Sequence, residues 1–210
     1  MSKQTTVNKK KVFGLLLLLL LVALGIGCLF LFGRVNRVDE ETGAADGQSA
    51  LAAFEDIAGE SRIDSLADLQ AAKNSPSPVA YLVENSVYVL DDAAIEVYAE
   101  SYITAAESTA QAAGVTVESL IVEEWGYDSV QAYRNEAREL TLSFVKERLA
   151  VYGAAGEMGV GITQKEYEDK LNTYAVNFGY ATAQEFTYAC TPASIANEML
   201  YDKTLEALCP

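Results

Sequence analysis

The longest uninterrupted helical pattern in this chain covers residues 128–159 and limits how the other segments can pack. Apolar residues recur there at spacings of three and four in two neighbouring stripes, which predicts a helix with a wide apolar face. Asp128 and Ser129 offer an N-cap and Gly159 a stop, so the helix should have about 30 residues and be roughly 45 Å long. A face this wide requires more than one packing partner. The stripes contain Val130, Tyr133, Ala137, Leu140 and Phe144, and Leu142, Val145, Leu149 and Tyr152.

A second constraint is the run of 22 uncharged, mostly apolar residues at positions 12–33. As a helix it would cover about 33 Å, enough for a hydrocarbon core of ~30 Å, so it predicts one transmembrane signal anchor. Four lysines precede it and two arginines follow it. The positive-inside rule then places residues 1–11 in the cytoplasm and residues 34–210 outside the cell, as a single-pass membrane protein. Cys28 lies within the run, and lipidation and a buried inert thiol are both open for it.

Charge and composition narrow the function further. Residues 34–210 carry 11 basic and 30 acidic groups, a net charge of −19, which repels nucleic acid. Histidine is absent, and the three cysteines show no ligand spacing, so no metal site or cofactor is expected. No nucleophile is paired with a base and no phosphate-binding loop follows a strand, so the sequence does not predict an enzyme.

The remaining segments predict an all-α fold. Residues 34–49 are acidic and rich in Gly and Ala, which predicts a flexible linker. Residues 50–90 predict a weakly helical connecting region, in which VAYLVENSVYVL is the candidate for one short β-hairpin. Helices should follow an Asp91 cap, Thr116, the Thr163–Glu166 capping box and Pro192. The last helix, if continuous, would hold Cys190 and Cys209 roughly 28 Å apart, too far for a disulfide.

The order of these signals in residues 91–210 resembles the C-terminal chaperone domain of trigger factor, which is similar to the helical domain of SurA-type chaperones. The resemblance is carried by a helix ending at Gly114, TVESL, Gly126, a long helix with EAREL and VKERL, GITQKEYEDKL, and a terminal IANEMLYDKTLEAL. It implies an extended multi-helix domain without the ribosome-binding or the FKBP-like isomerase domain. A prolyl isomerase activity is therefore not expected. The implied partners are unfolded or newly exported polypeptides.

Four aromatic residues on the two longest stripes are the candidates for binding such clients: Tyr98, Tyr102, Phe144 and Tyr152. Tyrosine combines an apolar body with a polar tip, which suits reversible contacts. The alternative is that these side chains only pack the helices together. At the level of function, the leading hypothesis is an ATP-independent holdase tethered to the membrane, and the alternative is a non-catalytic adaptor that binds one partner. The sequence leaves the clients and the oligomeric state open.

Overall fold

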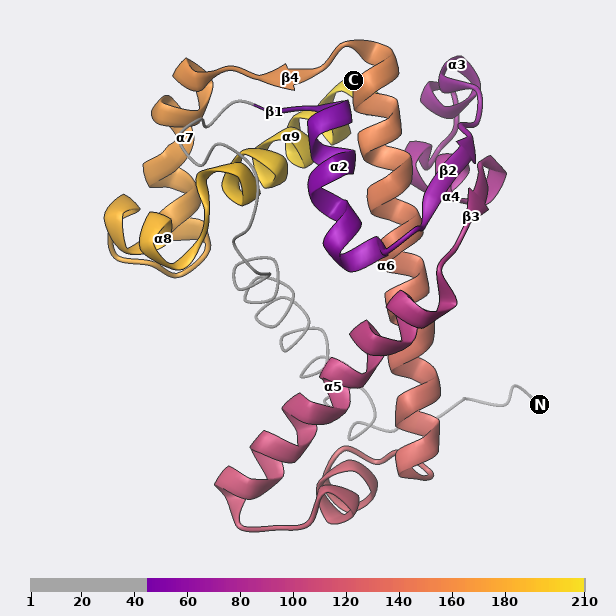
Figure 1. Ribbon diagram of the computed structural model, residues 1–210, viewed down its shortest axis with the longest axis vertical. Coiled ribbons are helices and arrows are strands. Elements are labelled where there is room, and N and C mark those ends of the chain that lie inside the picture. Colours follow the sequence, from indigo (N-terminus) through magenta and orange to yellow (C-terminus); the bar gives the residue numbers. More distant parts are fainter. Residues whose placement is uncertain (1–44, 210) are drawn as a thin grey trace, which may run out of the picture. The chain divides into compact units, whose positions relative to one another are not determined.

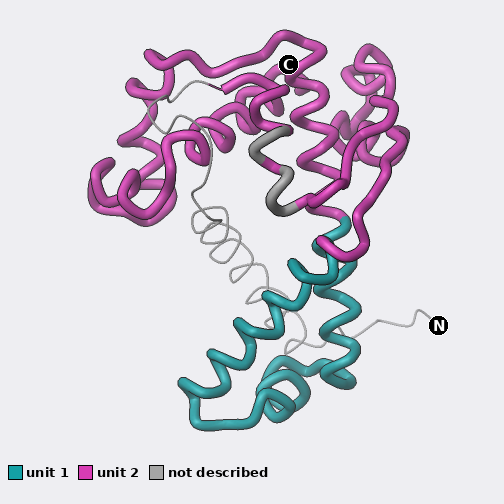
Figure 2. Tube along the Cα trace, in the orientation of Figure 1, with its two compact units in different colours: residues 1–29, 95–142 teal, residues 30–94, 143–210 magenta. Residues whose placement is uncertain are grey.

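The computed structural model describes residues 45–209, apart from the side chains of residues 52, 53 and 55–57, and is predominantly helical (Figure 1). The chain forms two compact units (Figure 2). Of the described residues, unit 1 contains 95–142, and unit 2 contains 45–94 together with 143–209. The chain passes from unit 2 to unit 1 between residues 94 and 95, close to the expected boundary at residue 90. It returns to unit 2 at residue 143, so residues 45–94 belong with the C-terminal part of the chain. No helix within residues 45–209 has the length and apolarity to cross a membrane, and the predicted span at 12–33 lies outside the described residues.

Helix α5 (Asp92–Ala113) contributes its residues from Ile95 onward to unit 1. The Asp91 carboxylate accepts hydrogen bonds from the backbone N–H groups of Ala93 and Ala94 at 3.0 and 3.2 Å, which confirms the predicted N-cap. The helix stops at Gly114, whose φ of 69° is readily adopted only by glycine. The side chains that α5 buries recur at helical spacing: Ile95, Tyr98, Ala99, Tyr102, Ile103, Ala106 and Ala110.

The segment after Thr116 is helical as predicted, but most of it is a π-helical turn, η1 (Ser119–Glu124). The Trp125 N–H donates to the Leu120 carbonyl five residues earlier, at 2.9 Å. This wider turn buries Leu120 and Ile121, and Trp125 is 4% exposed. The Trp125 and Tyr133 ring centroids lie 5.4 Å apart, so the turn is packed against the start of the next helix.

Helix α6 (Val130–Met158) is the predicted long helix, with its first part in unit 1 and its second part in unit 2. The Ser129 hydroxyl accepts from the Ala132 N–H at 3.0 Å, and Gly159 ends the helix with a φ of 65°. Both predicted ends are confirmed. In unit 2 the second part of α6 provides a nearly continuous buried stretch: Val145, Leu149, Ala150, Val151, Tyr152, Ala154 and Ala155.

Unit 2 joins residues from both ends of the described chain around α6. Strand β1 (Ala45–Asp46) pairs antiparallel with β4 (Gly161–Ile162), and β1, β4 and helix α2 (Gly47–Ala58) all contact helix α9 (Pro192–Leu208) (Figure 1). The predicted flexible linker at 34–49 is therefore wrong for residues 45–49. A Cβ on Gly47 would lie 2.2 Å from the Gly156 backbone nitrogen, so α2 and α6 approach each other as closely as glycine allows.

The predicted hairpin at VAYLVENSVYVL is also wrong. Its first half is helix α4 (Pro78–Asn85), which begins with a proline at N1, and only its second half is a strand, β3 (Val87–Val89). Strand β3 pairs with β2 (Arg62–Ser65), a segment that was not predicted as a strand. Helices α3 (Leu69–Lys73) and α4 connect the two strands. A small hydrophobic cluster that includes Leu82, Ala150 and Leu208 joins this region to α6 and α9, which overrides local β propensity.

The C-terminal helices follow the prediction closely. Helix α7 (Gln164–Asn177) begins with the predicted Thr163–Glu166 capping box, and α8 (Ala183–Ala189) and α9 follow. Lys203 on α9 donates to the Gly161 carbonyl at 2.8 Å and to the Glu166 carboxylate at 2.6 Å, which fixes the start of α7 on α9. Because α9 is unbroken, Cys190 and Cys209 lie beyond its two ends, and no disulfide joins them.

Candidate functional sites

Two of the four predicted client-binding residues, Tyr98 and Tyr102, lie on α5 inside unit 1. Each is 7% exposed, and their rings meet edge to face with centroids 6.2 Å apart. The Tyr133 hydroxyl donates to the Tyr102 carbonyl at 3.3 Å. Burial raises the pKa of Tyr102 to about 12. Both side chains are therefore committed to helix packing in this structure.

The other two, Phe144 and Tyr152, lie on α6 in unit 2. Tyr152 is 0% exposed, whereas Phe144 is half-buried. Both rings pack against Phe54 of α2: the Phe54 ring centroid lies 5.8 Å from that of Phe144 and 6.2 Å from that of Tyr152. The structure thus does not bring the four predicted residues into one site, and it places three of them in the packing role that the sequence left as the alternative.

A buried polar cluster that the sequence analysis did not find surrounds Arg148 on α6. Its guanidinium forms a two-point ion pair with Glu198 of α9, at 3.0 and 3.1 Å, and donates to the Tyr152 hydroxyl at 3.2 Å. The same group lies 4.0 Å from the centroid of the Tyr201 ring, and the Tyr201 hydroxyl donates to Glu147. This Arg148 cluster, made of Arg148, Glu198, Tyr152, Tyr201 and Glu147, joins α6 to α9.

The electrostatics of the Arg148 cluster keep its arginine charged. Burial by itself lowers the pKa of Arg148, but the Glu198 carboxylate and the Tyr152 hydroxyl outweigh it and raise the pKa above its ordinary value. Burial raises the pKa of Tyr152 to about 12, although Arg148 opposes the shift. Arg148 lies four residues from both Phe144 and Tyr152, so the signal in the sequence was a cation within an aromatic stripe.

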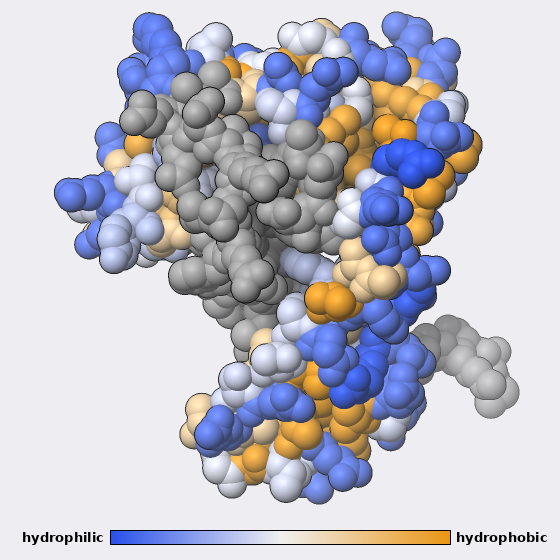
Figure 3. All heavy atoms as spheres, viewed as in Figure 1, coloured by the Kyte–Doolittle hydropathy of each residue, from blue (hydrophilic) through white to orange (hydrophobic). Residues whose placement is uncertain are grey.

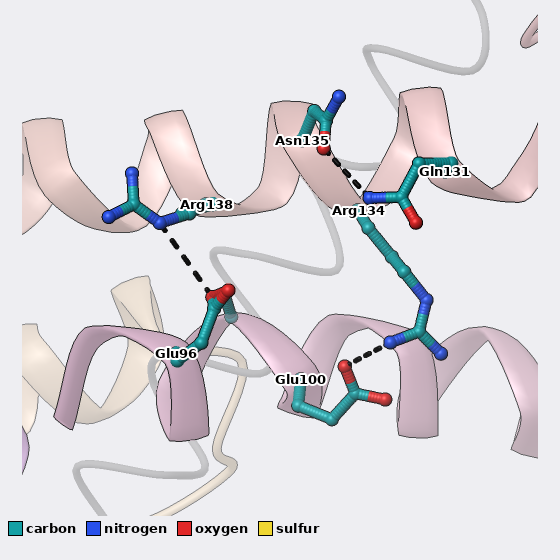
Figure 4. A pocket seen from close by; sticks show the side chains of 7 residues that line it. Glu96, Glu100, Gln131, Arg134, Asn135 and Arg138 are labelled. Carbon is teal, nitrogen blue, oxygen red and sulfur yellow. Dashed lines mark hydrogen bonds and ion pairs between the residues drawn. The ribbon is translucent and has the colours of Figure 1, made fainter. Parts of the chain in front are cut away.

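The second polar site is a hollow of about 150 Å³ between α5 and α6 within unit 1 (Figure 4). Arg134 pairs with Glu100 at 2.6 Å and Arg138 with Glu96 at 3.7 Å, and Gln131 donates to Asn135 at 2.9 Å. The Arg134 and Arg138 side chains are 40% and 35% exposed, which is more than a third in each case. Each of the two arginines faces a carboxylate, Glu100 or Glu96, and both ion pairs are partly exposed, so this hollow has the chemistry of a solvated ion-pair array.

Apolar side chains reach the surface in both units rather than in one place. Figure 3 shows hydrophobic areas in each unit, bordered by hydrophilic residues. Within the described chain, no group of three or more acidic or cysteine side chains is placed to hold a metal ion. The large apolar side chains with the greatest exposure are Val97 and Val115 in unit 1 and Val87, Val89, Val176, Phe178 and Tyr188 in unit 2.

Comparisons with protein-family models, with curated proteins and with solved structures find no match to this chain. The resemblance to the trigger factor C-terminal domain stays a prediction from the order of its helical signals.

Proposed function

We propose that this chain is a membrane-tethered, ATP-independent holdase that binds extended segments of exported polypeptides outside the cell. The observation that carries the proposal is the distribution of exposed apolar side chains over both units on an acidic surface. Isolated exposed valines each contribute little free energy, so a chain that touches several of them is held weakly and released easily. The predicted span at 12–33 and the trigger-factor-like order of helices support the tether and the client class.

The acidic surface fits this role in a second way. Strong net charge keeps the holdase soluble while a hydrophobic client is bound, and it disfavours binding of the holdase to itself. A cationic or neutral unfolded segment would be the preferred client, because like charges on an acidic segment add repulsion.

The second candidate is a non-catalytic adaptor with one fixed partner. It is favoured by the burial of Tyr98, Tyr102 and Tyr152, which removes three of the four predicted aromatic contacts for varied clients. A stable interface of that kind usually buries about 800 Å² on each partner in one continuous patch. The two candidates therefore differ in whether binding energy is spread over the surface or concentrated on it.

The test is a set of valine substitutions that change polarity but hardly change shape. The triple variant Val87→Thr, Val89→Thr and Val97→Thr, made in the full chain in lipid vesicles, should weaken suppression of client aggregation by roughly tenfold. Its urea unfolding midpoint should stay unchanged because all three side chains are exposed. The control is Thr104→Val, at an exposed position on α5, the helix that also carries Val97. This change should not weaken suppression of client aggregation.

Photo-crosslinking of the full chain in intact cells separates the two candidates. Many crosslinked polypeptides, reduced in number by the triple variant, would support the holdase. One dominant crosslinked protein that the triple variant leaves unchanged would contradict it and favour the adaptor.

A further inference from the structure

The end of α7 and the whole of α8 form an aromatic corner on unit 2, defined here by Val176, Phe178, Tyr180, Phe186 and Tyr188. The Phe178 and Phe186 rings are stacked with centroids 5.5 Å apart, and the Tyr180 ring lies 5.1 Å from Phe186. Phe186 is only 2% exposed, so it forms the base on which the other two rings rest. The corner is therefore a built aromatic layer whose inner ring is shielded by its outer ones.

The outer side chains of the aromatic corner face solvent. Tyr188 is 95% exposed, Val176 is 67% exposed and Phe178 is 40% exposed. These are three of the seven strongly exposed large apolar side chains of the described residues, and they come from one short stretch of sequence. Leaving them in water costs free energy that a suitable apolar or interfacial partner would recover.

Charge distinguishes the aromatic corner from the rest of the surface. Residues 171–197 contain one charged side chain, Glu185, in a chain with a net charge of −15. The Glu185 carboxylate also accepts a hydrogen bond from the Ala181 N–H at 3.1 Å. The segment that forms the corner is thus nearly neutral in a strongly acidic protein.

The aromatic corner lies at the far end of α7 from the β1–β4 pair, which contains Ala45, the first described residue. Ala45 of β1 pairs with Ile162 of β4, and α7 begins two residues later at Gln164. Helix α7 has 14 residues, which is about 21 Å. Only residues 34–44 separate Ala45 from the apolar run, a distance of at most about 40 Å when fully extended.

We propose that the aromatic corner docks on the lipid headgroup interface of the membrane in which the chain is anchored. Tyrosine prefers this interface because its ring enters the apolar region while its hydroxyl stays hydrated, and an exposed phenylalanine or valine gains from burial in the apolar region. A nearly neutral segment is also one that anionic lipids repel little. The inference rests on the proposed membrane anchor but not on the proposed clients.

The test measures whether position 188 approaches lipid. The chain has one tryptophan, Trp125, which is 4% exposed and gives a constant background. Tyr188→Trp is introduced into the full chain, which is reconstituted into phosphatidylcholine–phosphatidylglycerol vesicles with or without bromine on the acyl chains. The matched control is Val97→Trp, a position 76% exposed on α5. The fluorescence added at 188 should fall in brominated vesicles, whereas that added at 97 should not.

Two other outcomes would overturn the proposal, and they separate it from the anchor. Co-sedimentation of the chain with vesicles but equal fluorescence at position 188 with and without bromine overturns docking alone. A chain that does not co-sediment overturns the anchor and the docking together.

Discussion

Helix α6 contributes an arginine–glutamate pair to each unit, and the two pairs differ mainly in their surroundings. In unit 1 the Arg134–Glu100 pair has side chains that are 40% and 52% exposed. In unit 2 the Arg148–Glu198 pair has side chains that are 11% and 23% exposed. The exposed pair is the shorter one, at 2.6 Å against 3.0 Å, so distance does not rank their importance. Burial does rank them, because it determines whether water can replace a charged partner that a substitution removes.

In the exposed pair, water replaces a missing carboxylate or guanidinium at little cost, and such pairs contribute about 0–1 kcal/mol. In the largely buried pair, removal of one partner leaves a charge that little solvent reaches. The Arg148 cluster adds a hydroxyl and an aromatic ring around the same cation, so a substitution there disturbs several contacts at once.

The largest expected effect comes from breaking the buried pair. Arg148→Met should lower the free energy of unfolding by about 3–5 kcal/mol, because Glu198 is left largely buried without its cation. Arg134→Met, the matched change in unit 1, should cost about 0–1 kcal/mol. Urea unfolding of the reconstituted full chain, followed by circular dichroism, measures both. Equal losses would show that burial does not separate the two pairs.

The double variant Arg148→Met with Glu198→Leu tests the same comparison from the other side. Replacing both charges by apolar groups should recover most of the stability that the single change removes. If the double variant is as unstable as Arg148→Met, the loss comes from packing against Tyr201 rather than from an unpaired carboxylate.

A smaller effect is expected from removing single hydroxyl groups. Tyr152→Phe in unit 2 should lower the free energy of unfolding by about 1–2 kcal/mol, because Arg148 loses an acceptor. Tyr102→Phe in unit 1 should be neutral or slightly stabilising, because the buried Tyr102 hydroxyl has no hydrogen-bond partner among the described residues. Thermal unfolding compares the two variants directly. A larger loss of stability for Tyr102→Phe than for Tyr152→Phe would contradict the conclusion that only the Tyr152 hydroxyl has a stabilising hydrogen bond.

The smallest effect concerns Glu166 and Lys203, a pair of intermediate exposure at 37% and 32%. The hydrogen bond from Lys203 and those from Thr163 lower the pKa of Glu166 to about 2. A folded-state pKa below the ordinary value of 4.5 means that this carboxylate stabilises the fold above about pH 4.5, and that the contribution disappears as the pH falls through 2. Glu166→Gln should therefore lower the melting temperature at pH 7 but not near pH 2. A difference that is constant with pH would reject the ionic origin.

Helix ends were predictable because each carries its own chemistry. The Thr163–Glu166 box, the Ser129 cap and the glycines at 114, 126, 159 and 179 act within a few residues, so the sequence identifies them without knowledge of the fold. The mainly helical class followed from the same signals. The relative placement of the predicted membrane span is a separate matter, since residues 12–33 are not described.

Contacts between distant segments were not predictable in the same way. Val87–Val89 is a strand because residues 62–65 lie beside it, and α4 is a helix where local β propensity favours a strand. The role of the tyrosines depended on the same kind of information. Periodicity placed Tyr98, Tyr102 and Tyr152 on apolar faces, but only the packing shows which faces are covered. Tyr133 of α6 lies against Tyr102, and Phe54 of α2 and Tyr201 of α9 lie against Tyr152.

The pairing of β1 with β4 has a consequence for how this chain is made. The described part of unit 1, residues 95–142, is one continuous segment, so these residues become available together as synthesis proceeds. The described part of unit 2 is discontinuous, so β1 and α2 cannot complete their contacts until β4 and then the 17 residues of α9 have been synthesised. Until then Phe54 and the face around it have no C-terminal cover. A protein proposed to bind incompletely folded chains thus leaves part of its own core incomplete until α9 has been synthesised.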